Sequence, residues 1–325
     1  MTTRRASSII AAAATLLVPA IGQAQGHQVI GNGTPAGCTS ARVVAAVARG
    51  GLITFDCGAK PVVIKMAATA KVRNTSATVV IDGGGKVTLS GQGRRRILYQ
   101  NTCDRAQVWT TSHCNDQASP RLIVRDITLH SGNSTGQTTD GGGGGAVFVR
   151  GGRLQVQNVR FTANRCDANG PDLGGAAIRV LDQYHRLPVL VTGSTFTGGR
   201  CANGGAISSI GVSWTIRSSV FRGNRATGRG ANPARSGTPG GGNGGAVYLD
   251  GNRFTLLLDR STIEDNVARE GGGAIFFVSN DRTGRATVTG STLRRNPSLG
   301  FETMPGIFYL GSAPRPTVRT STITR

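Results

Sequence analysis

Residues 144–164 read GGAVFVRGGRLQVQNVRFTAN, and residues 244–266 read GGAVYLDGNRFTLLLDRSTIEDN. Both stretches begin with Gly-Gly-Ala, continue through short runs in which apolar and polar residues alternate, and end in asparagine. Alternation with a period of two is typical of β-strands, because successive side chains point to opposite faces. The chain therefore repeats one strand-rich unit.

The repeat extends over most of the chain when Phe161 is taken as a reference position. Apolar residues lie seven and five residues before it, at Leu154 and Val156, and these offsets recur in six other segments. A repeat of this length, built from strands and turns, indicates a stacked array. The reference positions are Leu129, Phe161, Phe196, Phe221, Ile263, Leu293 and Ile323.

Return of the same residue type at the same offset favours parallel strands, since each unit then lies on the last at a spacing of about 4.8 Å and like side chains stack. We expect an all-β fold, a single-stranded right-handed parallel β-helix of about eight to ten coils over residues 52–325. The reference residues should stack in its core.

Three further columns follow from the same register. Asparagines three residues after the reference positions should share amide hydrogen bonds at a turn where asparagine tolerates left-handed geometry. Serines should form an internal file whose hydroxyls satisfy one another, and aromatic residues should form a strip that is either core or a sugar-stacking surface. The columns are Asn164, Asn224, Asn266 and Asn296; Ser194, Ser219, Ser261, Ser291 and Ser321; and Phe148, Tyr248, Phe276 and Phe308.

The start of the chain predicts export. Residues 1–24 combine two arginines, a short apolar run and a small-residue site, which is typical of a cleaved signal peptide. No later stretch is apolar for long enough to span a membrane. We expect residues 25–51 to form an N-terminal cap over the core, as solenoid ends require.

Six cysteines in an exported chain indicate three disulfides. Sequence spacing suggests Cys38 with Cys57 and Cys103 with Cys114. Cys166 and Cys201 both lie five residues after a reference position, so stacked coils would bring them within disulfide range.

The Gly-Gly-Ala-aliphatic and Phe-x-x-Asn signals at residues 144–147, 161–164, 204–207 and 221–224 resemble those of polymorphic outer-membrane protein repeats. The stretch VVIDGGGKVTLSG at residues 79–91 is similar to the early coils of pectin-lyase-like β-helices. The resemblance implies a surface or secreted protein used in adhesion. Because no membrane barrel or sorting domain follows the repeats, we expect a periplasmic or freely secreted protein, associated with the cell surface or free.

Charge points to an anionic partner. The formal net charge is +21, and only four of the 37 basic residues are lysines. Arginine offers a planar donor fork to carboxylate, sulfate or phosphate, although coding bias and solubility would also give such an excess. Few aromatic residues accompany the arginines, which disfavours nucleic acid. The candidate ligand-binding residues, which would otherwise form a surface ion-pair ladder, are Arg125, Arg217, Arg222 and Arg294.

Two functions remain open. The favoured hypothesis is a non-catalytic, cofactor-free protein that binds an anionic polysaccharide or another cell-surface component. The alternative is a polysaccharide lyase, with Arg217, Arg222 or His130 as the base. Such a lyase would hold Ca²⁺ with clustered acids, for which the candidates are Asp259, Glu264 and Asp265.

Overall fold

The computed structural model describes residues 26–137 and 142–325, so the predicted signal peptide lies outside the described residues. Nearly all regular structure in these ranges is β, and the pairs between strands β1 to β30 are parallel. Each of the eight coils from β2 to β28 contributes one strand to each of three long sheets, in the order sheet A, sheet B, sheet C. The architecture is the predicted parallel β-helix.

The three long sheets run the length of the molecule, and a fourth, sheet D, spans three coils. Sheet A comprises β1 (His27–Gly31), β2 (Gly51–Asp56), β5 (Thr78–Asp82), β8 (Arg121–Arg125), β11 (Arg153–Gln157), β14 (Val189–Thr192), β18 (Trp214–Arg217), β22 (Thr255–Asp259), β26 (Arg285–Thr289) and β29 (Thr317–Arg319). Sheet B comprises β3 (Val62–Lys65), β6 (Val87–Ser90), β9 (Thr128–His130), β12 (Arg160–Thr162), β15 (Thr195–Thr197), β19 (Val220–Arg222), β23 (Thr262–Glu264), β27 (Thr292–Arg294) and β30 (Thr322–Ile323). Sheet C comprises β4 (Ala70–Lys71), β7 (Leu98–Asn101), β10 (Val147–Arg150), β13 (Ile178–Leu181), β17 (Ile207–Ile210), β21 (Val247–Gly251), β25 (Ile275–Ser279) and β28 (Ile307–Leu310), and sheet D comprises β16 (Arg200–Cys201), β20 (Arg225–Ala226) and β24 (Val267–Ala268).

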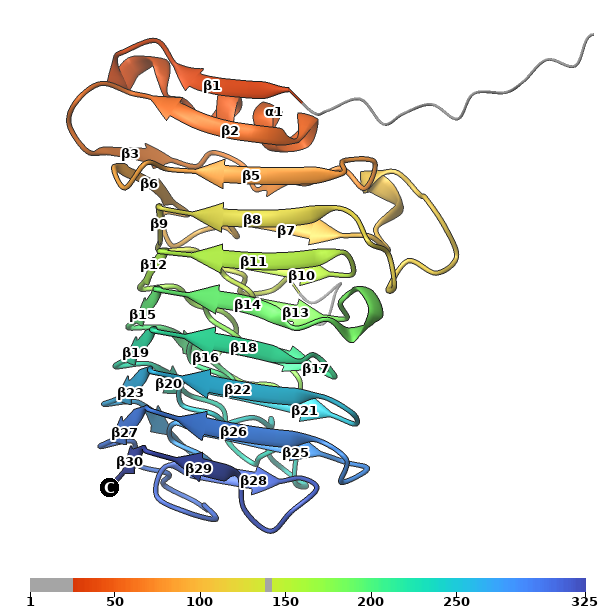
Figure 1. Cartoon of the computed structure of the whole chain (residues 1–325), viewed down its shortest axis with the longest axis vertical. Helices are drawn as coiled ribbons and strands as arrows, with labels where there is room; N and C mark the ends of the chain where they lie inside the picture. Colours follow the sequence, from red (N-terminus) through yellow and green to blue (C-terminus); the bar gives the residue numbers. More distant parts are fainter. Residues whose placement is uncertain (1–25, 138–141) are drawn as a thin grey trace, which may run out of the picture.

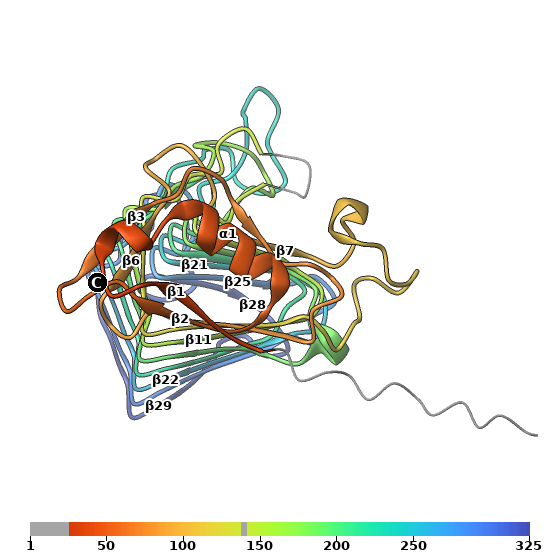
Figure 2. The ribbon, with the colours of Figure 1, turned by 90° about the horizontal axis from the view of Figure 1, so that it is seen from above.

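The solenoid is right-handed. In Figure 1 the strands of sheet A cross the front toward the left, where the strands of sheet B turn the chain to the back. Seen from above in Figure 2, the chain turns clockwise while it descends from the N-terminal end, which defines a right-handed coil. The ten strands of sheet A and eight of sheet C agree with the expected eight to ten coils.

The predicted core register is confirmed. Phe161 pairs with Leu129 on one side and Phe196 on the other, and the column continues to Ile323. The rings of Phe161 and Phe196 stack with centroids 4.6 Å apart, and those of Phe196 and Phe221 are 4.4 Å apart. Parallel stacking of like side chains thus forms the interior.

The predicted sharing of amide hydrogen bonds is confirmed for Asn224, Asn266 and Asn296, whereas Asn164 bonds to the backbone of Gly132 and Leu129. Asn224 Nδ2 donates to Asn266 Oδ1 at 2.8 Å, and Asn266 Nδ2 donates to Asn296 Oδ1 at 2.9 Å. The left-handed residue is not the asparagine but the one before it, for example Asp265 with φ 58°. The asparagine is selected for its buried amide, not for its backbone freedom.

The serine file is structural, but its partners differ from the expectation. Ser219 Oγ accepts from the backbone N–H of Ser194 at 3.2 Å and donates to the carbonyl of Arg217 at 2.8 Å. The same pattern recurs at Ser261 and Ser291. The prediction that the hydroxyls bond to one another was therefore wrong. Backbone N–H and carbonyl groups of the turns are the partners of each hydroxyl, so the serines do not form a continuous hydrogen-bonded chain.

The Gly-Gly pair has two distinct physical roles. At Gly244 the backbone is left-handed, with φ 68°. At Gly245 an added Cβ would collide with the carbonyl oxygen of Gly273 on the next coil. The first glycine therefore makes the turn and the second lets two coils touch through their backbones.

Helix α1 (Ser40–Arg49) lies across the N-terminal end of the solenoid (Figure 2), where its buried residues Val43, Ala46 and Val47 join the core. The hydroxyl of Thr39 accepts from Arg42 N–H at its start. Strand β1, which precedes the helix, pairs with β2 in sheet A. The parallel sheet thus extends upstream of the expected boundary at residue 52.

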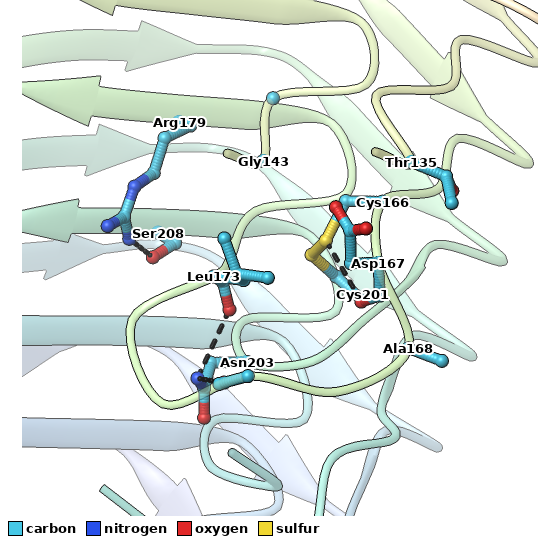
Figure 3. The surroundings of a disulfide bond; sticks show 12 residues. Thr135, Gly143, Cys166, Asp167, Ala168, Leu173, Arg179, Cys201, Asn203 and Ser208 are labelled. Carbon is cyan, nitrogen blue, oxygen red and sulfur yellow. Dashed lines mark hydrogen bonds between the residues drawn. A yellow bond between two sulfur atoms is a disulfide. The ribbon is translucent and has the colours of Figure 1, made fainter. Parts of the chain in front are cut away.

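All three predicted disulfides are present: Cys38–Cys57, Cys103–Cys114 and Cys166–Cys201. The last joins successive coils with a Cα–Cα distance of 4.8 Å, which equals the coil spacing used to predict it. Figure 3 shows this bond beside Asn203, whose amide donates to the Leu173 carbonyl at 3.1 Å. In the described ranges no helix has the length and apolarity needed to cross a bilayer.

Candidate anion-binding groove

The four predicted binding arginines lie on the outer faces of sheets A and B, and each is engaged by a carboxylate. Each contact joins neighbouring coils, and we call these contacts together the ion-pair ladder. Single ion pairs on a protein surface contribute little to stability. The pairs are Arg125 with Asp82 at 2.9 Å, Arg217 with Asp259 at 3.7 Å, Arg222 with Asp265 at 3.3 Å and Arg294 with Glu264 at 2.7 Å.

The acids proposed as a calcium site are occupied by the same ladder. Asp259 also contacts Arg260 at 3.0 Å, and Asp265 accepts from Arg295 at 2.7 Å. The pKa of Asp265 is lowered, chiefly because Arg295 donates this hydrogen bond. Over residues 26–137 and 142–325, no three His, Cys, Asp or Glu side chains are grouped so that they could hold a metal ion.

His130 lies on β9, three coils before Arg222 in the same column of sheet B. Its Nδ1 is 2.8 Å from the Thr162 hydroxyl, and its Nε2 is 2.9 Å from the hydroxyl of Ser131. Both ring nitrogens thus have hydroxyl partners. The structure does not bring His130 together with the arginines or the acids of the lyase hypothesis.

The aromatic column points outward from sheet C but is covered by the loops that precede the strands. Tyr248 and Phe276 stack at 5.1 Å, as do Phe276 and Phe308. Phe148 and Tyr248 are fully buried. The strip is therefore mainly packing surface beneath loops, not a sugar-stacking platform in this conformation.

Buried Arg179 occupies the same column, between Phe148 and Ser208. Its guanidinium donates to the Ser208 hydroxyl, as Figure 3 shows, and to the Asp172 carbonyl at 2.6 Å. Burial lowers the pKa of Arg179, with Tyr248 and Asp172 opposing that shift. This contact fastens the loop that follows Cys166 to sheet C.

A neighbouring contact fastens the loop of residues 228–243. Asn232 Nδ2 donates to Asp172 Oδ1 at 3.0 Å and to Asp250 Oδ2 at 3.1 Å, and Tyr248 donates to Asp250 at 3.0 Å. Burial raises the pKa of Asp250 and raises that of Tyr248 well above its usual range. Loop and strand side chains satisfy one another here, so the arrangement is structural.

Two adjoining hollows lie at the turns that lead from sheet C into sheet A. The first has a volume of about 440 Å³ and the second about 580 Å³, and they share Arg186 and Arg253. We call them together the turn groove. Its lining includes Asp182, Gln183, Arg186, Ile210, Gly211, Val212, Ser213, Asn252, Arg253, Phe254, Thr255, Asn280, Asp281, Thr283 and Arg285.

The groove exists because successive turns differ in length. The connection after β13 takes residues 182–188 and bulges outward (Figure 1), whereas the next connection takes only residues 211–213. Gly211 adopts φ 67° and has no side chain to fill the space. The short turn is therefore the floor, between walls formed by residues 182–188 above and by residues 252–254 and 280–284 below.

The groove carries arginines that the ladder does not use. Arg186, Arg253 and Arg285 are exposed, and no carboxylate of the described residues lies within ion-pair distance of them. Other arginines, such as Arg160 and Arg225, are also unpaired in this part of the chain but do not line the groove. Unpaired guanidinium groups in a hollow can bind carboxylate, sulfate or phosphate.

Two acids lie in the groove. Asp281 accepts hydrogen bonds from the N–H and the hydroxyl of Thr283. The pKa of Asp281 is lowered, chiefly by the hydrogen bond from the Thr283 N–H. This carboxylate is therefore committed to its own turn. The pKa of Asp182 is raised because its surroundings partly desolvate it, while Arg150 opposes the shift and Asp116 adds to it.

The sequence hypothesis missed the groove arginines because they lie in the connections between repeated blocks. One signal was present: Arg186 and Arg253 both lie three residues before the first core residue of a sheet A strand, Val189 and Leu256. Arg285 directly precedes the corresponding Ala286.

These features define a parallel β-helix protein with three disulfides and a basic groove along one edge. Comparison of the chain with protein-family models, with curated proteins and with solved structures found no match. The resemblance to polymorphic outer-membrane protein repeats stays a prediction from sequence.

Proposed function

We infer that the protein is an exported, non-catalytic β-helix that binds an anionic polysaccharide of the cell envelope or its surroundings in the turn groove. The observation that carries this proposal is the placement of Arg186, Arg253 and Arg285, without carboxylate partners, around hollows of about 440 and 580 Å³. The net charge of +21 would steer an acidic polymer toward the molecule from a distance.

The composition of the groove supports a glycan over a small anion. Exposed amide side chains of Asn252 and Asn280 line it beside the arginines. Sugars present hydroxyl groups that can bond to such amides. An elongated, open groove also suits a polymer better than an enclosed pocket would.

Export is part of the proposal. Three disulfides are compatible with an oxidising compartment, such as the periplasm or the medium. The predicted signal peptide and the resemblance to surface-protein repeats favour the same location. An adhesive or envelope role, at the surface or free of it, would follow from glycan binding there.

The test compares two double variants that lose the same charge. Arg186→Gln with Arg253→Gln removes groove arginines, and Arg160→Gln with Arg225→Gln removes exposed arginines elsewhere. Because a hydrogen bond to a charged group contributes about 1.5–3 kcal/mol, the groove variant should bind hyaluronan oligosaccharides at least about tenfold more weakly. The control should stay within about twofold, as measured by titration calorimetry at fixed ionic strength.

Equal weakening of both variants would contradict the groove and leave only nonspecific charge attraction. The lyase alternative has a separate readout, since β-elimination creates an unsaturated uronide that absorbs in the ultraviolet. Formation of that product from polygalacturonate, alginate or glycosaminoglycans, with or without Ca²⁺, would contradict the non-catalytic assignment.

A further inference from the structure

We propose that Asp116 is a positioning residue for the turn groove, because its carboxylate holds the connection of residues 182–188 in the conformation that presents Arg186 to both hollows. This inference rests on the proposed function and adds a residue of another coil on which binding depends. Asp116 lies outside both hollows, so its effect on the glycan is exerted through Arg186.

Arg186 reaches the groove from a stretch of backbone that is unfavourable on its own. His185 and Arg186 are both left-handed, with φ 47° and 57°. Neither is glycine, and the left-handed region is uncommon for residues with a side chain because Cβ then approaches the following carbonyl oxygen. Two such residues in succession need contacts with the surrounding structure to hold them in place.

One of these contacts comes from a different coil. Asp116 Oδ1 accepts from the backbone N–H of His185 at 2.6 Å, and Asp116 Oδ2 lies 4.0 Å from His185 Nε2. The ring of Tyr184 stacks on that of His185 with centroids 4.0 Å apart, and the Tyr184 N–H donates to the carbonyl of Gly152 at 3.0 Å. The carboxylate thus fixes the backbone directly before Arg186.

Asp116 is itself held in place by its neighbours. It follows a loop that the Cys103–Cys114 disulfide closes. The adjacent Asn115 accepts from Arg150 Nε, on β10 of sheet C, at 2.9 Å. This loop and the connection that carries Arg186 project from the same edge of the solenoid (Figure 1). The acceptor for the backbone before Arg186 is therefore preorganised.

The test compares two variants that lose the same charge. Asp116→Ala removes the acceptor, whereas Asp116→Asn keeps a side-chain oxygen that can accept from the His185 N–H. In titration calorimetry at fixed ionic strength, Asp116→Ala should bind hyaluronan octasaccharide about fivefold more weakly, because Arg186 is then no longer preorganised. Asp116→Asn should stay within about twofold of the unaltered protein, since its hydrogen bond is retained.

Two further measurements separate positioning from a general loss of structure. Because Asp116 acts through Arg186, Asp116→Ala should change the affinity by no more than about twofold in an Arg186→Gln background. In the unliganded protein, hydrogen–deuterium exchange of the His185 amide should be faster in Asp116→Ala than in Asp116→Asn.

Three results would overturn the inference: equal affinities of Asp116→Ala and Asp116→Asn, equal exchange of the His185 amide in both, or a loss of affinity that persists in the Arg186→Gln background. Any of them, with binding still dependent on Arg186 and Arg253, would leave the proposed function standing. Failure of the unaltered protein to bind hyaluronan octasaccharide would contradict the proposed function itself.

Discussion

At the scale of single residues, the Gly-Gly-Ala motif gains a physical explanation. Gly244 supplies a left-handed turn, and Gly245 has no room for a side chain because the Gly273 carbonyl of the next coil lies against it. The sequence predicted that the motif recurs but not that its two glycines differ. Only the stacked backbone reveals which of them faces the neighbouring coil.

Gly245→Ala is therefore expected to be strongly destabilising. The added Cβ would force two coils apart, at a cost of about 2–3 kcal/mol or more in the free energy of unfolding. The matched control is Gly223→Asp, because an added Cβ at Gly223 meets nothing within 4 Å and Asp265 occupies the equivalent left-handed position. The control should cost about 1 kcal/mol. Denaturant titration measures both, and equal losses would contradict the contact between coils as the cause.

At the scale of elements, the strands obey the register that the repeat predicts, while their outer faces acquire an ion-pair ladder. Sequence reasoning places Arg222, Glu264 and Arg294 in one column, because each directly follows a reference position of the repeat, and they do pair in register. It did not predict that Arg295, in the turn after β27, would also reach Glu264 and Asp265. Side-chain reach from a turn depends on local geometry that periodicity does not encode.

The ladder predicts a pH dependence of stability. The folded-state pKa of Asp265 is lowered, first by the hydrogen bond from Arg295, so its ionised form favours the folded state. This contribution is complete above the unfolded-state pKa of about 3.9 and is lost as pH falls through the lower folded-state pKa. Asp265→Asn should melt below the unaltered protein at pH 7, with the difference shrinking toward about pH 2. A difference that grows on acidification would contradict the assignment.

At the scale of the whole molecule, the fold was predictable because each coil repeats the same offsets, and stacking then fixes the core and one inter-coil disulfide. Cys166 and Cys201 show this most clearly, since equal offsets alone brought them together. The groove was not predictable in the same way. It depends on the unequal lengths of the connections formed by residues 182–188 and 211–213, and on which arginines have no carboxylate as an ion-pair partner. Both are properties of the turns and not of the repeat.

The central claim is that an acidic glycan binds at the turn groove and not on the ion-pair ladder. The most direct measurement is hydrogen–deuterium exchange of the protein with and without saturating hyaluronan octasaccharide. We expect slower amide exchange in residues 182–188, 211–213, 252–254 and 280–284, with no change around Arg222, Glu264 and Arg294. Protection confined to the ladder strands, with exchange in the four turns unaltered, would contradict the account.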